Sequence, residues 1–444
     1  MEKRDVVVYS EDYKKLLNAK AYAGKYYEID ERVEEICKEA FKGCDKLEEI
    51  VMPKKLKKID SEAFQGCSSL TKLTLPNRVR IIEVSAFEGC SGLTELTLPN
   101  SVKIIGDGAF AYCSGLEKIT VESGNSRYDS RDNCNSIIDK KTNTLIAGCK
   151  NSVIPNGVTS IGDSAFGWCS EFTELVLPNS VTSIVESAFA YCSGLEKITV
   201  ESGNSRYDSR DNCNSIIETA TNTLIAGCKN SVIPNSVTSI GDSAFEGCTG
   251  LTELTLLKSV TSIGDSAFEG CTGLTELTLP KSVKSIVDSA FYGCTGLTEL
   301  TLSNSLKCIE AFAFSGCRGI TKLTLPNSVT SIGDSAFGGC SGLTELTLPN
   351  SVTSIGDCAF EGCTGLTELT LPNSITSIGD YAFAYCSDLS KITSLAEIPP
   401  MCGFKVFNGV NKTNCELIVP EGSVAAYTRA EDWNKFSNIR GFSK

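Results

Sequence analysis

Residues 343–363, which read LTELTLPNSVTSIGDCAFEGC, show a pattern of apolar and polar positions that recurs along the chain and that we name the frame. Leu346 and Leu348 alternate with Glu345 and Thr347, and this period of two predicts a strand with one face turned inward. The Pro-Asn pair that follows predicts a turn, because proline fixes φ and asparagine tolerates a bend.

The second half of the frame returns apolar side chains to the interior. Val352 and Ile355 are expected to point inward, and Asp357 stands where a short helical turn ahead of Phe360 would take an N-cap. This position is aspartate in eight coils, at residues 107, 163, 242, 265, 288, 334, 357 and 380. One layer of a continuous core is therefore predicted from Leu343, Leu346, Leu348, Val352, Ile355, Ala359, Phe360 and Cys363.

The cysteine that closes each frame marks a long-range period. These cysteines are Cys44, Cys67, Cys90, Cys113, Cys169, Cys192, Cys248, Cys271, Cys294, Cys317, Cys340, Cys363 and Cys386. Every step is 23 residues except two steps of 56. A fixed period of this length predicts stacked coils, none of which can bury its apolar face alone.

Thirteen of the 22 cysteines thus fall in one interior column. A buried free cysteine behaves as a small hydrophobe, and parallel side chains on stacked coils do not converge as a disulfide requires. No C-x-x-C pair is present, which argues against zinc. Outside the column, a bridge between Cys134 and Cys149, or between Cys402 and Cys415, stays an alternative.

Two longer units account for the 56-residue steps. Residues 111–166 and 190–245 differ at only four positions, and the segment NSIIDKKTNTLIAG within the first predicts a hairpin. The preceding polar loop, ESGNSRYDSRDN, is expected to be solvated. A calcium loop is disfavoured because the glycine and glutamate of an EF-hand are absent.

The two ends leave the regular frame, as a solenoid requires, because an uncapped coil exposes its core. Residues 1–29 are predicted to form a capping hairpin, with Tyr9, Leu16 and Leu17 in the places of Ile138, Leu145 and Ile146. The repeats are assigned to 30–393, with the longer units near 119–158 and 198–237.

Residues 394–444 are predicted to cap the other end. Leu417 to Val419 read as a strand, and a short helix carrying Tyr427 is expected after it. Trp433 and Phe436 are expected to cover the last layer.

Composition and charge exclude several functions. The chain has 444 residues and a formal charge of −13, and this negative charge disfavours nucleic acid as a partner. It contains no histidine, which excludes catalysis by an imidazole group. No phosphate-binding glycine motif or nucleophile elbow is present, so we expect no enzymatic activity and no cofactor. No apolar run is long enough for a membrane span. The start, MEKRDVVVYSEDYKK, lacks the apolar core of a signal peptide, so a cytoplasmic location stays open.

The pattern LxxLxLPxxVxxIxxxAFxxC resembles the BspA-type leucine-rich repeat, a 23-residue class, and the tail from Ile398 to Phe436 resembles the C-terminal cap of its bacterial members. The resemblance implies an α/β leucine-rich-repeat solenoid, curved and right-handed. One short parallel strand and short helical turns are expected in each coil, with hairpins in the longer units. It also implies a surface or secreted adhesion protein that binds a protein or glycan on a host or neighbouring cell. Ser351 stands where ordinary leucine-rich repeats place a ladder asparagine.

The outward strand positions, expected on the concave face, are the candidate binding surface. The position of Glu345 is charged in every coil, and that of Thr347 is threonine in all but two, Val51 and Val176. The candidate residues are Glu253, Glu276, Glu299, Lys322, Glu345, Glu368, Thr255, Thr278, Thr301, Thr324, Thr347 and Thr370. Glutamates on adjacent strands cost stability. They therefore hint at a basic partner or a divalent cation, although duplication alone also explains them. The alternative function is a scaffold without a dedicated ligand.

Overall fold

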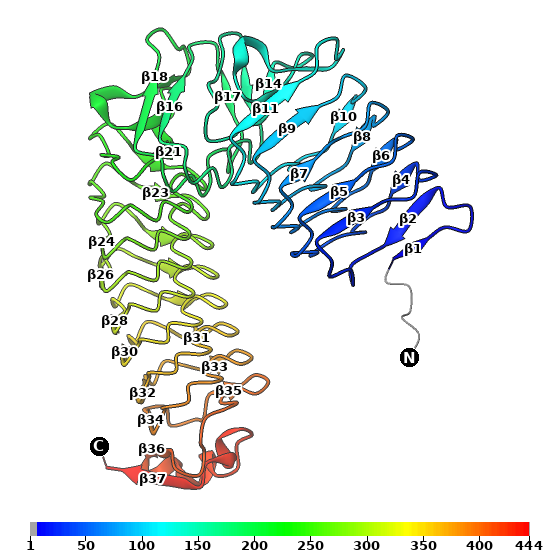
Figure 1. Cartoon of the computed structure of the whole chain (residues 1–444). Helices are drawn as coiled ribbons and strands as arrows, with labels where there is room; N and C mark the ends of the chain where they lie inside the picture. Colours follow the sequence, from blue (N-terminus) through cyan, green and yellow to red (C-terminus); the bar gives the residue numbers. More distant parts are fainter. Residues whose placement is uncertain (1–6, 444) are drawn as a thin grey trace. The chain divides into compact units, whose positions relative to one another are not determined.

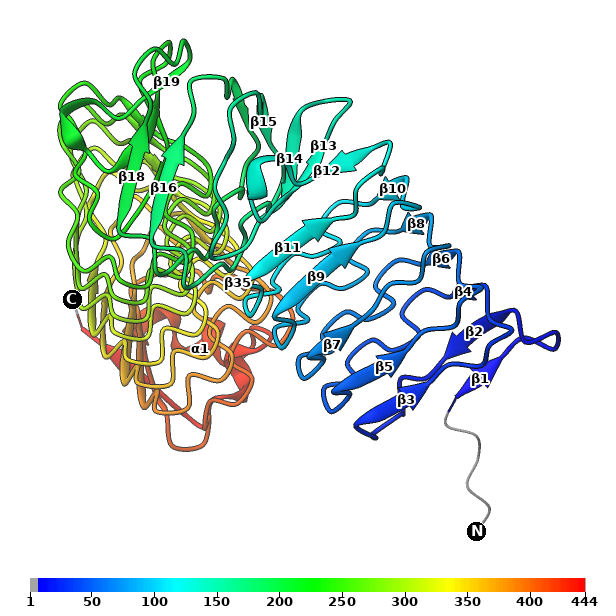
Figure 2. The same cartoon turned by 45° about the horizontal axis from the view of Figure 1, so that its top comes forward.

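The computed structural model describes residues 7–443 and divides into two units, Met1–Thr219 and Ala220–Lys444. The first six residues of the predicted N-terminal cap and the last residue of the predicted C-terminal cap lie outside the described residues. Each unit is a stack of coils whose strands lie side by side (Figures 1 and 2).

Each regular coil carries two strands. In residues 343–363 these are β30 (Glu345–Thr347) and β31 (Ser354–Ile355). We name the first kind the ELT ladder and the second kind the SI ladder. The structure confirms a solenoid of parallel strands and adds the SI strand, which the pattern did not predict because two residues are too few to show alternation.

In unit 1 the ELT ladder consists of β3 (Tyr26–Glu28), β5 (Glu49–Val51), β7 (Lys72–Leu73), β9 (Glu95–Leu98), β11 (Lys118–Val121), β16 (Glu174–Leu177) and β18 (Lys197–Val200). The SI ladder consists of β2 (Lys15–Asn18), β4 (Glu35–Ile36), β6 (Lys58–Ile59), β8 (Ile81–Ile82), β10 (Ile104–Ile105), β15 (Ser160–Ile161) and β17 (Ser183–Ile184). The remaining elements are β1 (Val8–Tyr9), β12 (Tyr128–Asp129), η1 (Arg131–Asn133), β13 (Ile137–Asp139), β14 (Thr144–Ala147), β19 (Tyr207–Asp208), η2 (Arg210–Asn212) and β20 (Ser215–Glu218).

In unit 2 the ELT ladder consists of β24 (Glu276–Thr278), β26 (Glu299–Thr301), β28 (Lys322–Thr324), β30, β32 (Glu368–Leu371), β34 (Lys391–Ser394), β36 (Glu416–Pro420) and β37 (Asn438–Phe442). The SI ladder consists of β21 (Thr223–Gly227), β22 (Ser239–Ile240), β23 (Ser262–Ile263), β25 (Ser285–Ile286), β27 (Cys308–Ile309), β29 (Ser331–Ile332), β31, β33 (Ser377–Ile378) and β35 (Met401–Cys402). Helical elements occur near the end of the chain, as η3 (Glu421–Ser423), α1 (Val424–Tyr427) and η4 (Trp433–Lys435).

The hairpins of unit 1 share one register. Tyr9 pairs with Leu16 across β1 and β2, and Ile138 pairs with Leu145 across β13 and β14. These are the equivalences expected from the sequence. Strand β14 then pairs in parallel with β15, so the hairpin joins the SI ladder.

The polar loop before the β13–β14 hairpin is not fully solvated, which corrects the sequence expectation. Asn125 is buried, and its side-chain amide donates to the carbonyl oxygens of Pro99 and Val102 at 3.0 and 3.1 Å. Its carboxamide oxygen accepts the backbone N–H groups of Arg127 and Tyr128. One asparagine thereby ties the loop to the previous coil, because it offers donors and an acceptor together.

The predicted core layer is confirmed, since all eight of its side chains are buried. Phenylalanines of successive coils stack in nearly parallel pairs. Phe314 lies 5.3 Å from Phe291 and 5.4 Å from Phe337, measured between ring centroids. In unit 2 the rings from Phe245 to Phe383 therefore form one continuous column, whereas in unit 1 the stack from Phe41 ends at Phe110, before the hairpin.

The cysteine column is also confirmed, and its thiols have a further role as hydrogen-bond donors. The Cys340 thiol donates to the carbonyl oxygen of Phe314 at 3.2 Å, and the Cys363 thiol donates to that of Phe337 at 3.3 Å. Burial raises the pKa of Cys340 to about 12. All 22 cysteines lie within residues 7–443 and none of them forms a disulfide bond, including the four for which a bridge was an alternative.

The aspartate at the coil corner does not cap a helix. Residues 357–362 form turns, and Cys358 has a φ of 53°, in the left-handed region. Asp357 Oδ1 instead accepts the backbone N–H of Asp380 at 2.7 Å, and Asp334 Oδ1 accepts that of Asp357 at 2.8 Å. The carboxylate therefore joins one coil to the next.

The last coil is covered by the segment after α1. Trp433 and Phe436 are buried against the ring of Phe407, and Trp433 Nε1 donates to the carbonyl oxygen of Pro400 at 2.9 Å. Strand β36 and helix α1 contain the strand and helix expected there, and Tyr427 on α1 is buried.

Candidate functional site: the outward face of the ELT ladder

The strand period places the candidate side chains in solvent. In β30, Leu346 is buried while Glu345 and Thr347 are exposed. All twelve predicted residues are exposed in the same way. The face they form is a row of carboxylates, ammonium groups and hydroxyls at the spacing of the coils.

Parallel pairing brings several of these residues together. Glu276 is in register with Glu299, and Thr278 with Thr301, across β24 and β26. Lys322 is in register with Glu345, and Thr324 with Thr347, across β28 and β30.

The strand expected at Glu253 is absent, since residues 251–257 have no regular secondary structure. The preceding coil presents residues 231–234, which form no strand, so one side of this segment lacks a regular partner. Glu253 and Thr255 are still exposed. The backbone N–H of Thr275 donates to the carbonyl oxygen of Thr252 at 3.3 Å, which keeps Glu253 beside the coil of Glu276.

Some of the lysine and glutamate side chains that face each other on neighbouring ladder strands form ion pairs. Lys322 Nζ lies 2.8 Å from Glu345 Oε2, and Lys391 Nζ lies 3.1 Å from Glu368 Oε2. The hydrogen bond to Glu345 raises the pKa of Lys322. Such exposed pairs contribute about 0–1 kcal/mol each.

Glu253, Glu276 and Glu299 form what we name the acidic run. Within residues 7–443, none of the three is within ion-pair distance of a lysine or arginine. Glu276 and Glu299 also stand directly opposite each other, which is unfavourable for like charges. The acidic run is therefore a part of the described ladder where like charges lie on neighbouring coils without an ion pair to a basic side chain.

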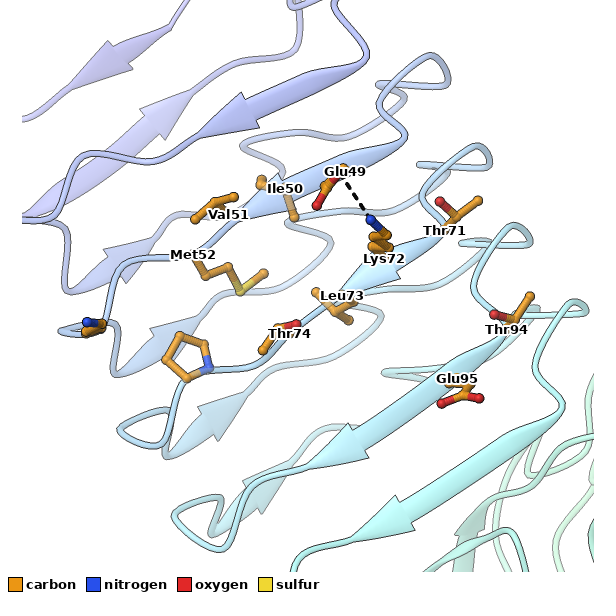
Figure 3. Close-up of a pocket in the computed structure, with 12 residues that line it drawn as sticks. Glu49, Ile50, Val51, Met52, Thr71, Lys72, Leu73, Thr74, Thr94 and Glu95 are labelled. Carbon is orange, nitrogen blue, oxygen red and sulfur yellow. Dashed lines mark ion pairs between the residues drawn. The ribbon is translucent and has the colours of Figure 1, made fainter.

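Unit 1 contains a hollow that the sequence did not predict. A depression of about 540 Å³ lies over β5, β7 and β9, and Figure 3 shows the Glu49–Lys72 pair on its wall, with Nζ and Oε2 3.6 Å apart. Strand β7 ends at Leu73, whereas β9 runs on to Leu98. In the sequence, this hollow could have been recognised from Val51, an exposed residue that interrupts the row of threonines.

The carboxylates of this face have similar, solvent-exposed surroundings. Acid–base catalysis needs carboxyl groups in contrasting environments, whereas these are uniformly exposed. Over residues 7–443, no cluster of three or more acidic or cysteine side chains is arranged to hold a metal ion. No helix in that range is long and apolar enough to cross a membrane.

The chain belongs to the BspA-type leucine-rich repeat family. The family model, described as a BspA type leucine rich repeat region, matches residues 20–138, 136–225, 222–344 and 307–414. Most of the chain is therefore made of this repeat, as the sequence pattern predicts.

Solved structures of leucine-rich repeat proteins are similar to this chain. A leucine-rich cell surface protein of Faecalibacterium prausnitzii is 25% identical, with 88% of this chain and 86% of that chain covered and a TM-score of 0.42. A leucine-rich repeat protein of Bacteroides ovatus is 28% identical, with 84% and 86% covered and a TM-score of 0.35. A comparison with curated proteins finds no match.

Proposed function

We propose that this chain is a non-enzymatic adhesion module that binds a protein or glycan partner through the outward face of the ELT ladder in residues 253–370. The observation that carries the proposal is the acidic run. Its like charges oppose each other without an internal counter-charge. A partner with basic groups would relieve that repulsion on binding, which gives both attraction and specificity.

Two further features support this role. The face is regular and belongs to a continuous packed column, so it would lose little conformational entropy on binding. Membership of the BspA-type family supports a location on the cell surface or outside the cell, where such a module meets host matrix or neighbouring cells.

The test measures binding of the purified chain to immobilised extracellular-matrix proteins and mucosal glycans, with and without calcium and at two salt concentrations. Replacing Glu253, Glu276 and Glu299 by glutamine is expected to weaken saturable binding by about tenfold or more, and high salt is expected to weaken it too. The matched control replaces Glu49, Glu95 and Glu174 by glutamine, which removes the same charge from ladder strands of unit 1, outside the proposed face.

Binding that survives in the control and falls in the acidic-run variant supports the proposal. An equal loss in both variants places recognition elsewhere on the ladder. No binding by a folded sample to any surface favours the scaffold alternative instead.

A further inference from the structure

A second charged surface lies at the corner between the ELT and SI strands of unit 1. Lys57, Arg78, Arg80 and Lys103, which we name the basic corner, line a hollow of about 710 Å³ together with Asn77 and Ser101. All four basic side chains are exposed. They gather on a chain whose formal charge is −13.

Backbone hydrogen bonds fix the basic corner in place. The N–H of Arg80 donates to the carbonyl oxygen of Lys57, and the N–H of Lys103 donates to that of Arg80, both at 2.8 Å. Three basic residues thus stand on three consecutive coils. The rings of Phe64 and Phe87 in these coils are 5.1 Å apart, which gives the repeat distance of the row.

The fold does not require basic residues at these positions. The equivalents of Arg78 and Arg80 in residues 343–363 are Ser351 and Thr353. The serine at this position forms a ladder between coils, as Ser351 Oγ donates to the carbonyl oxygen of Val329 and Ser101 Oγ to that of Val79. This serine ladder occupies the place of the asparagine ladder of ordinary leucine-rich repeats.

The threonine position makes a similar bond. Thr376 Oγ1 donates to the carbonyl oxygen of Thr353 at 3.1 Å. An arginine at either position gives up the bond that the short side chain makes. Among the described residues, the guanidinium groups of Arg78 and Arg80 have neither a hydrogen-bond partner nor an ion-pair partner. At these two positions the chain therefore has the cations of Arg78 and Arg80, without a counter-charge, in place of two hydrogen bonds between coils.

We infer that the basic corner is a binding site for a polyanionic polysaccharide, that is, a chain bearing sulfate or carboxylate groups. Guanidinium groups suit such anions because their fork of donors matches paired oxygens. A single-stranded nucleic acid needs aromatic side chains on which bases stack, and none lines this hollow. This site is separate from the acidic run and does not depend on the proposed function.

The test titrates the full chain with heparin as the sulfated probe and polygalacturonate as the carboxylated probe. Neutral dextran and a length-matched single-stranded oligonucleotide complete the set. Replacing Arg78 by serine and Arg80 by threonine installs the residues of the other coils, so folding should be retained. Affinity for the bound polyanion is expected to fall about tenfold or more, and the slope of log K against log salt to decrease by about two.

The matched control replaces Lys284 and Lys307 by threonine, which removes two positive charges in unit 2, both at the frame position of Arg80. Selective loss in the Arg78→Ser, Arg80→Thr variant supports the proposal, and the preferred probe identifies the anion. An equal loss in the control, unchanged polyanion binding in the arginine variant, no binding of either polyanion, or tighter binding of the oligonucleotide through the same arginines would overturn it.

Discussion

The regular coils contribute side chains to two rows that run along the stack, one inside the core and one on the outward face of the ELT ladder. The residue types in these two rows vary to different degrees from coil to coil. In unit 2 the inside row is phenylalanine in each of Phe245, Phe268, Phe291, Phe314, Phe337, Phe360 and Phe383. The outside row in the same unit switches between glutamate and lysine. The difference shows that packing fixes the inside row, because each ring must match the ring above and below it.

The outside row is freer because its charges are solvated. Glu276 opposite Glu299 and Lys322 opposite Glu345 occupy the same frame and form the same parallel strand pairing. The fold accepts both arrangements, so this row can differ between coils without loss of the solenoid. A change of charge in this row leaves the packed core unchanged, and the following predictions test that separation.

The largest effect is expected from alkaline pH, which acts on the inside row. Burial raises the pKa of Cys340 and Cys386 to about 12, against about 9 for an unfolded thiol. Below pH 9 both states are protonated, whereas above it only the unfolded state loses protons, so stability falls as pH rises. Each such thiol should cost about 1.4 kcal/mol per pH unit between 9 and 12.

Urea unfolding midpoints measured from pH 7 to 11 check this prediction. The midpoint should be level up to about pH 8.5 and fall steeply above pH 9. A Cys340→Ala variant has one buried thiol fewer, so its midpoint should fall less steeply with pH, by the contribution of that thiol. A midpoint that stays level to pH 11 would contradict the assigned burial of the column.

Truncating one ring of the inside row is the next largest change. Phe314→Ala removes a fully buried side chain stacked on both sides and should destabilise the chain by about 3–5 kcal/mol. Thr324→Ala, on the outside row, should change stability by less than about 0.5 kcal/mol. Urea titration of both variants decides the matter, and comparable losses would show that the rows are not energetically distinct.

The sequence predicted the features that lie within one coil. The alternation at Leu346 and Leu348, the buried layer and the thiol column follow from residue types and a 23-residue frame. The side-chain hydrogen bonds that join one coil to another were not predicted. The Asp357 carboxylate bonds to the coil after it and Asn125 to the coil before it, and neither contact is visible in a single frame.

The candidate surfaces show the same division. Exposure of the twelve ladder residues follows from the strand period, but the absence of a strand at Glu253 does not, because Glu174 follows a nearly identical irregular coil and lies in β16. The basic corner was not predicted because the net charge is a sum over the whole chain. Lys57, Arg80 and Lys103 are brought together only when the coils stack. A frame-by-frame comparison with Asn-Ser-Val-Thr would have revealed it.

Removing a coil-to-coil bond should have an intermediate effect. Asp357→Ala leaves the N–H of Asp380 without its acceptor and should cost about 1 kcal/mol. Asp357→Asn retains the Oδ1 acceptor and should cost less. Chemical denaturation of the two variants separates the hydrogen bond from the charge, and an equal loss in both would assign the effect to charge instead.

The smallest effect is expected from exchanging charges on the outside row. Lys322→Glu converts the Lys322–Glu345 pair into the like-charge arrangement of Glu276 and Glu299, and it should destabilise the chain by less than about 1 kcal/mol. Glu276→Lys, between Glu253 and Glu299, makes the converse change and should stabilise the chain by a few tenths of a kcal/mol, and both effects should shrink as salt rises. Thermal unfolding of the two variants at two salt concentrations measures these effects. If Glu276→Lys instead destabilised the chain while Lys322→Glu were neutral, the acidic run would be required by the fold, and its charge would no longer argue for a partner.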